Sequence, residues 1–135
     1  MKALARHLRV LDMLHALFSS GPTDPGAPEQ MVQRTRIAIR EGDVDLAEAL
    51  LGECGDAADA DTDCLNLKGV IAEMRGDWRA ARQYWVRAAK GTPQSAAAKH
   101  NLRRYYELFE FGRCRDWVAF GDEPEFVLTR REGWL

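Results

Sequence analysis

The sequence repeats itself at a spacing of 34 residues, and this spacing limits the folds open to the chain. REGDVDLAEALL, residues 40–51, aligns with MRGDWRAARQYW, residues 74–85, so that Gly42-Asp43 corresponds to Gly76-Asp77. Glycine readily adopts the left-handed conformation that ends a helix, and an aspartate after it caps the next helix. Each repeat is therefore predicted to be two helices joined by a tight turn.

The fullest repeat spans residues 62–95. It has small, apolar or turn-forming residues where two stacked helices approach each other or end: Leu65, Gly69, Gly76-Asp77-Trp78, Ala81, Trp85, Ala88 and Pro93. This pattern resembles a tetratricopeptide repeat (TPR). The resemblance implies that Gly69 lies where two helices are closest. It also places Trp85, and Tyr106 of the next repeat, in the core between helices.

Two less complete repeats flank this one. Residues 28–61 have Thr35 and Asp59 where the family usually has glycine and proline, but keep Gly42-Asp43, Ala47, Leu51 and Cys54. Residues 96–111 match a partial third repeat. The resemblance thus covers about two and a half repeats over residues 28–111. It implies an all-α fold, a TPR-like helical repeat (α-solenoid).

Both ends of the chain lie outside the repeats. Residues 1–20 carry apolar residues at three- and four-residue spacings, which predicts an amphipathic helix. The segment SSGPTDPGAP, residues 19–28, holds three prolines and two glycines and is predicted to be a linker. Residues 112–135 are predicted to form a C-terminal capping segment and an irregular tail, with a short helix over 114–120 anchored by Trp117.

Composition and residue spacing disfavour several classes of function. No apolar run approaches the about 20 residues of a membrane span, and a net charge of −2 does not favour nucleic acid as partner. Three unclustered cysteines indicate a reducing compartment, so we expect a cytoplasmic protein, and its Ala/Arg/Asp/Gly-rich usage is typical of bacteria. No histidine, serine or cysteine has catalytic or metal-binding spacing, so we expect no enzyme, metal or cofactor.

The acidic string Asp59-x-Asp61-x-Asp63 resembles the start of a calcium loop but lacks that loop's later glycine and glutamate. We interpret it as a turn between repeats, in which Thr62 or Asp63 caps the next helix.

In the TPR family, the inner face of the first helix of each repeat lines a concave ligand groove. Carried onto this chain, the resemblance assigns these residues to the groove: Val32, Arg36, Ile39, Arg40, Asn66, Val70, Glu73, Met74, His100, Arg104, Glu107 and Leu108. Arg36, Arg40 and Arg104 are expected to pair with ligand carboxylates and to contribute to binding rather than folding. The lysine and asparagine residues of the family's two-carboxylate clamp are missing, so a heat-shock co-chaperone is not predicted.

The resemblance implies a protein-binding function, as an adaptor, scaffold or small chaperone that holds a peptide or helix of a partner in this groove. One alternative is a chaperone for an aggregation-prone secreted subunit, and another is an RNA-binding helical repeat that uses its arginines. The N-terminal helix is expected to cover the first repeat, or else to dock on a second copy, giving a homodimer, or on another partner. Residues 21–61 carry a net charge of −7 and residues 62–135 a net charge of +3, which favours oriented docking.

Overall fold

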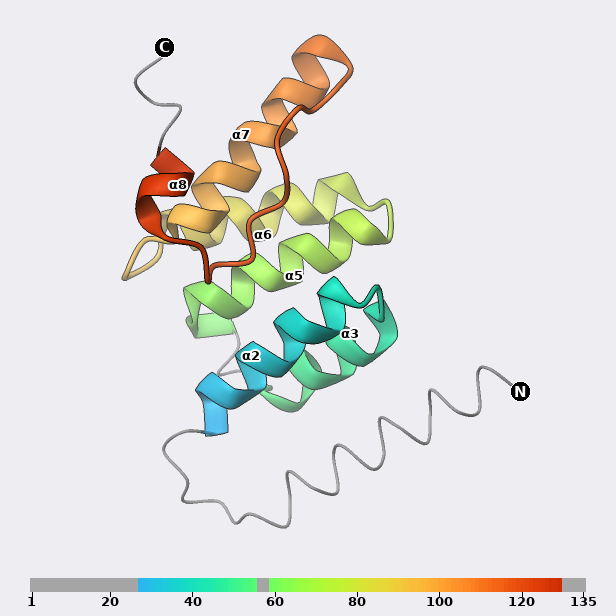
Figure 1. The fold of residues 1–135 in the computed structure, drawn as a ribbon, viewed down its shortest axis with the longest axis vertical. Coiled ribbons are helices and arrows are strands. Elements are labelled where there is room, and N and C mark those ends of the chain that lie inside the picture. The colour runs from blue at the N-terminus through green and yellow to red at the C-terminus, as the bar shows by residue number, and fades with distance from the viewer. Residues whose placement is uncertain (1–26, 56–58, 130–135) are drawn as a thin grey trace, which may run out of the picture. The chain divides into compact units, whose positions relative to one another are not determined.

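The computed structural model describes residues 27–55 and 59–129 (Figure 1). Within these ranges every regular element is a helix and no strand occurs, so the all-α prediction is confirmed there. The described residues divide into two compact units, 27–55 and 59–129. No helix in the described ranges is both long enough and apolar enough to cross a membrane. The predicted helix over residues 1–20 lies outside the described residues.

The first unit is a helical hairpin of α2 (Ala27–Arg40) and α3 (Val44–Glu53). Gly42 has a φ of 77°, and the Asp43 carboxylate accepts a hydrogen bond from the Leu46 N–H at 3.2 Å. This confirms the predicted Gly-Asp turn. The buried Thr35, in the place of the usual glycine, satisfies its hydroxyl by donating to the Met31 carbonyl at 2.8 Å.

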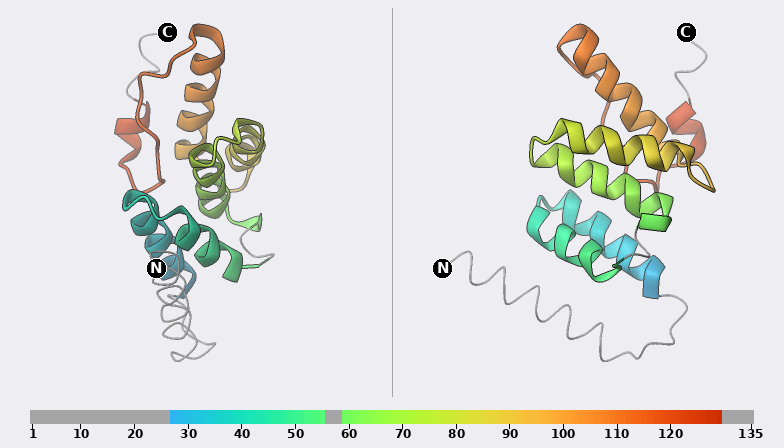
Figure 2. Two further views of the ribbon diagram at one scale, coloured as in Figure 1. Left: turned by 90° about the vertical axis from the view of Figure 1, so that its right-hand side faces the viewer. Right: turned by 180° about the vertical axis from the view of Figure 1, so that it is seen from behind.

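The second unit begins with the same kind of hairpin, made of α5 (Thr62–Met74) and α6 (Trp78–Lys90). Gly76 has a φ of 79°, and Asp77 accepts from the Ala80 N–H at 3.1 Å. The third helix, α7 (Ala96–Phe111), packs on α6, and its far half rises away from the α5–α6 pair (Figures 1 and 2).

The core of this hairpin depends on one glycine. Trp85 of α6 is fully buried against Gly69 of α5, and its indole N–H donates to the Asn66 carbonyl at 3.3 Å. A Cβ atom at Gly69 would overlap the indole ring. The predicted close approach at Gly69 and the core position of Trp85 are therefore confirmed. Tyr106 was wrongly predicted to be in the core: it is 48% exposed.

The start of α5 differs from the prediction. Asp61, rather than Thr62 or Asp63, caps this helix, because its backbone is extended and its carboxylate accepts from the N–H groups of Asp63 and Cys64 at 2.8 and 3.3 Å. Asp59 instead pairs with Lys68 at 2.6 Å. The hydrogen bond and charge of Lys68 lower the pKa of Asp59. Two acids of the string thus have structural partners within the second unit.

The segment after α7 is not the predicted helix. Gly112, with a φ of 70°, ends α7, and residues 113–120 run back along the helix as a non-helical strap (Figures 1 and 2). The Glu123 carboxylate then accepts from the N–H groups of Phe120 and Gly121 at 2.6 and 2.8 Å. A short helix that was not predicted, α8 (Glu125–Thr129), follows.

Candidate functional site

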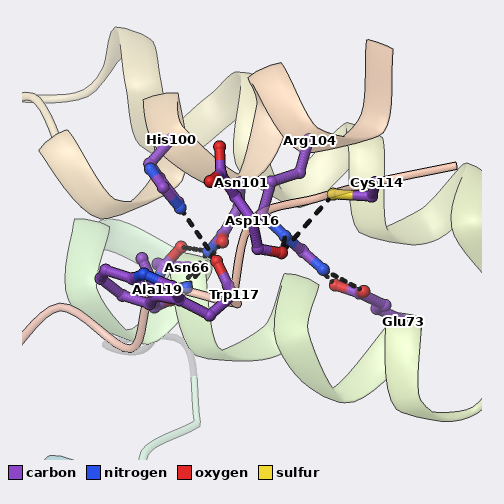
Figure 3. A network of polar contacts seen from close by, with 9 residues as sticks. All are labelled: Asn66, Glu73, His100, Asn101, Arg104, Cys114, Asp116, Trp117 and Ala119. Atoms are coloured by element: carbon purple, nitrogen blue, oxygen red, sulfur yellow. Dashed lines mark hydrogen bonds and ion pairs between the residues drawn. The ribbon is translucent and has the colours of Figure 1, made fainter. Parts of the chain in front are cut away.

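The strap lies on the face of α5 and α7 that the TPR resemblance assigned to a ligand. Four of the predicted groove residues meet there: Asn66 and Glu73 from α5, and His100 and Arg104 from α7 (Figure 3). A fifth side chain, Asn101, was not predicted. Together these five side chains contact main-chain groups of the strap or support the contact, and we call them the strap network.

Two asparagines hold the backbone of Ala119. The side-chain amides of Asn66 and Asn101 both donate to the Ala119 carbonyl, at 3.0 and 2.8 Å. The Asn101 carbonyl oxygen accepts from the Ala119 N–H at 2.8 Å, and its amide also donates to the Asn66 side-chain oxygen at 2.9 Å. All three residues are fully buried. Side chains therefore satisfy both backbone groups of Ala119, as a neighbouring strand would.

Arg104 joins α5, α7 and the strap. Its guanidinium donates to both Glu73 carboxylate oxygens at 2.9 Å, while Nε donates to the Asp116 carbonyl at 2.9 Å (Figure 3). The paired side chains are only 7% and 13% exposed. Burial disfavours the charged form of Arg104 and so lowers its pKa. The hydrogen bonds and charges of Glu73 and Cys114 outweigh this effect, so the pKa of Arg104 is raised.

The direction of this shift determines how Arg104 itself responds to pH. Because the pKa of Arg104 is higher in the folded than in the unfolded chain, its contribution to stability is complete below the ordinary arginine pKa. It is lost only as the pH rises through the folded value, in strongly alkaline solution. Titration of Arg104 therefore does not release the strap near neutral pH.

His100 contacts the strap at Trp117. Its Nε2 atom lies 2.9 Å from the Trp117 carbonyl, and because a carbonyl can only accept, Nε2 carries the proton. The two rings also pack at a centroid distance of 5.1 Å. Trp117 itself is 46% exposed. Trp117, the predicted anchor of the capping segment, is thus held through its backbone carbonyl, and its side chain is only half-covered.

None of the known proteins compared matches this chain. No family model, curated protein or solved structure gives a match. Function must therefore be inferred from the arrangement of the side chains themselves.

The strap network is saturated by its own contacts. Every buried side-chain nitrogen and oxygen in the described ranges has a hydrogen-bond partner. Over the same residues no group of three or more histidine, cysteine, aspartate or glutamate side chains is placed to hold a metal ion. Chemically, the arrangement binds an extended backbone through amide, imidazole and guanidinium donors.

The other predicted groove residues are distributed over both units. In the first unit, Val32, Arg36 and Ile39 are buried and Arg40 is exposed; Arg36 donates to Gln33 at 3.3 Å. In the second unit, Val70 is buried, Met74 is exposed, and Glu107 and Leu108 are partly exposed.

Two further surfaces lie around the far half of α7. The first, which we call the aromatic surface, consists of Trp78, Tyr105, Tyr106 and Phe109. The ring of Tyr105 lies 6.3, 5.5 and 4.7 Å from those of Trp78, Tyr106 and Phe109, measured between centroids. In the sequence, residues 105 and 106 lie four and three positions before residue 109, which places these aromatic side chains close together on a helix and could have indicated this surface.

The second surface is an open depression of about 660 Å³ between the end of α7 and the start of the strap. Its lining is formed by Glu107, Phe111, Arg113 and Arg115. Only Glu107 was among the predicted groove residues. We call this feature the arginine depression.

Replacing Trp117 with alanine is expected to loosen the strap without unfolding the second unit. The change removes the ring packing on His100 but leaves the Trp117 carbonyl as an acceptor. Because the ring is half-exposed, we expect a loss of about 1 kcal/mol in the free energy of unfolding, measured by urea denaturation. A loss as large as that of a fully buried tryptophan, about 3–5 kcal/mol, would contradict this position for the ring.

Proposed function

We propose that this chain is a non-enzymatic, TPR-like adaptor that binds a protein partner on the aromatic surface of α7. The helical hairpins with matching Gly-Asp turns support the repeat architecture. The strap supports a partner site elsewhere than on the groove face of α5 and α7, because the chain's own backbone occupies that face.

The observation that carries this proposal is the exposure of the large aromatic side chains. Phe109 is 69% exposed and Tyr106 is 48% exposed, although both touch or adjoin the ring of Tyr105. Large contiguous apolar patches on soluble proteins commonly mark a site that binds a partner. Tyrosine and tryptophan are also enriched among residues that dominate the binding energy of protein interfaces.

A capture experiment with matched variants tests this proposal. The tagged full-length chain is used to capture a partner, and the affinity of the purified complex is then measured by calorimetry. Phe109→Ser combined with Tyr106→Ser is expected to weaken binding by about tenfold or more, because each truncation removes an exposed anchor. Circular dichroism should show an unchanged helical content.

Ile37→Ser provides the control. Ile37 is an exposed apolar residue of α2, in the first unit, so the change removes an exposed apolar side chain and leaves every residue of the aromatic surface in place. Equal weakening by both variants would refute a specific role for the aromatic surface. If the chain captures RNA instead of protein, and this RNA binding falls steeply as the salt concentration is raised, the alternative RNA-binding function would be supported.

A further inference from the structure

The arginine depression combines two cations with an exposed ring. Arg113 and Arg115 alternate along the strap and are both exposed, and Phe111 is 67% exposed beside them. Both arginines follow the last repeat-like helix, so they lie outside every repeat position. In contrast with Arg104, neither forms a hydrogen bond or ion pair with the described residues.

Hydrogen bonds to the strap backbone fix the positions of these two arginines. Between and after them, Cys114 donates to the Asp116 carbonyl at 3.6 Å, and Arg104 donates to that same carbonyl at 2.9 Å. Cys114 and Asp116, which alternate with the arginines, are partly buried, whereas Arg113 and Arg115 are exposed. Because successive side chains of an extended segment point to opposite sides, Arg113 and Arg115 are presented together toward the depression.

We propose that the arginine depression binds an acidic segment of the protein partner, with carboxylates on Arg113 and Arg115 and an apolar side chain on Phe111. This inference rests on the proposed adaptor function and specifies the chemistry of its partner. Arginine binds carboxylates in a bidentate geometry, and Arg113 and Arg115 have no hydrogen bond or ion pair with another described residue to break when they do so.

The lining favours a peptide over a nucleic acid. Glu107 places a carboxylate in the same lining, so acidic groups are attracted only at Arg113 and Arg115, and a continuous row of phosphates is disfavoured. A strand of nucleic acid is normally held along a groove of many positive charges. Two arginines beside one glutamate form a site for a pair of acidic side chains rather than for a strand of nucleic acid.

Synthetic peptides test this proposal on the full-length chain. The probes are fluorescein-labelled Gly-Glu-Glu-Phe-Glu-Glu-Gly and its counterpart with lysine in place of glutamate, with binding followed by fluorescence anisotropy. We expect the acidic peptide alone to bind. Arg113→Glu combined with Arg115→Glu should weaken this binding about tenfold or more, and binding should fall as salt is raised.

A control variant with the same change in total charge distinguishes binding at the arginine depression from a general attraction between the chain and the peptide. Arg82→Glu with Arg87→Glu alters two exposed arginines of α6 and shifts the total charge by the same amount. This control should bind the acidic peptide within about twofold of the unchanged chain. The R113E/R115E variant should instead gain affinity for the lysine peptide.

Each outcome has a defined meaning. Equal weakening by the two double variants, or no binding of the acidic peptide, would overturn the inference. Tighter binding of a labelled oligouridine than of the acidic peptide, lost in R113E/R115E, would assign the depression to nucleic acid instead. If R113E/R115E leaves partner capture intact while the aromatic variant abolishes it, the adaptor function stands and the acidic-segment inference fails.

Discussion

Replacing Gly69 with leucine is expected to unfold the α5–α6 hairpin or leave it loosely packed. Even the Cβ atom of alanine at this position would overlap the indole of Trp85, which is fully buried. Gly69→Ala should lower the free energy of unfolding by about 1–3 kcal/mol, and Gly69→Leu by more. Urea denaturation followed by circular dichroism measures both.

Gly52 supplies the control for this prediction. It lies within α3, and a Cβ atom added there would meet nothing within 4 Å. Gly52→Ala should therefore be neutral or should stabilise the chain by up to about 1 kcal/mol, through helix propensity alone. If alanine at Gly69 proved equally harmless, the close contact between Gly69 and Trp85 would be wrong.

Replacing Asn101 with alanine is expected to release the strap. The change removes three buried hydrogen bonds and leaves the Ala119 N–H and the Asn66 side-chain oxygen without these partners. We expect a loss of about 2–4 kcal/mol in the free energy of unfolding. Limited trypsin digestion gives a second readout, because cleavage after Arg115 should become faster once the strap leaves α7.

Lys99→Ala is the matched control for Asn101→Ala. Lys99 lies two residues before Asn101 on α7 but is exposed, and its ammonium donates to the exposed Gln94 side chain at 2.6 Å. Its removal should change stability by less than about 0.5 kcal/mol and should not affect cleavage after Arg115. Unchanged stability and unchanged cleavage in Asn101→Ala would show that the asparagine pair does not hold the strap.

Local signals explain which parts of the fold could be predicted. The two hairpin turns follow from Gly-Asp pairs, whose left-handed glycines and capping carboxylates act within four residues of each other. The contact of Gly69 with Trp85 follows from the repeat pattern. Even the misplaced cap of α5 lies only one or two residues from Asp61, the residue that forms it.

The strap could not be predicted in the same way, because its partners are distant in the sequence. The Ala119 carbonyl is bound by side chains 18 and 53 residues away. Every residue has a backbone carbonyl that can accept a hydrogen bond, so nothing in the sequence of the strap identifies Ala119 as the residue that is bound. Asn66, Glu73, His100 and Arg104 are four of the twelve residues that the resemblance assigns to the groove, but their part in holding the chain's own backbone depends on the path after Gly112.

The path of the strap also limits how such a chain can lengthen during evolution. Helical-repeat proteins lengthen most simply by duplication of a hairpin. A duplication inserted after Gly112 would remove the backbone that satisfies Asn66 and Asn101. Each buried polar group left unpaired costs about 1–3 kcal/mol. Insertion at this point is therefore tolerated only if both asparagines change with it, so two polar side chains restrict the number of hairpins that the gene can acquire.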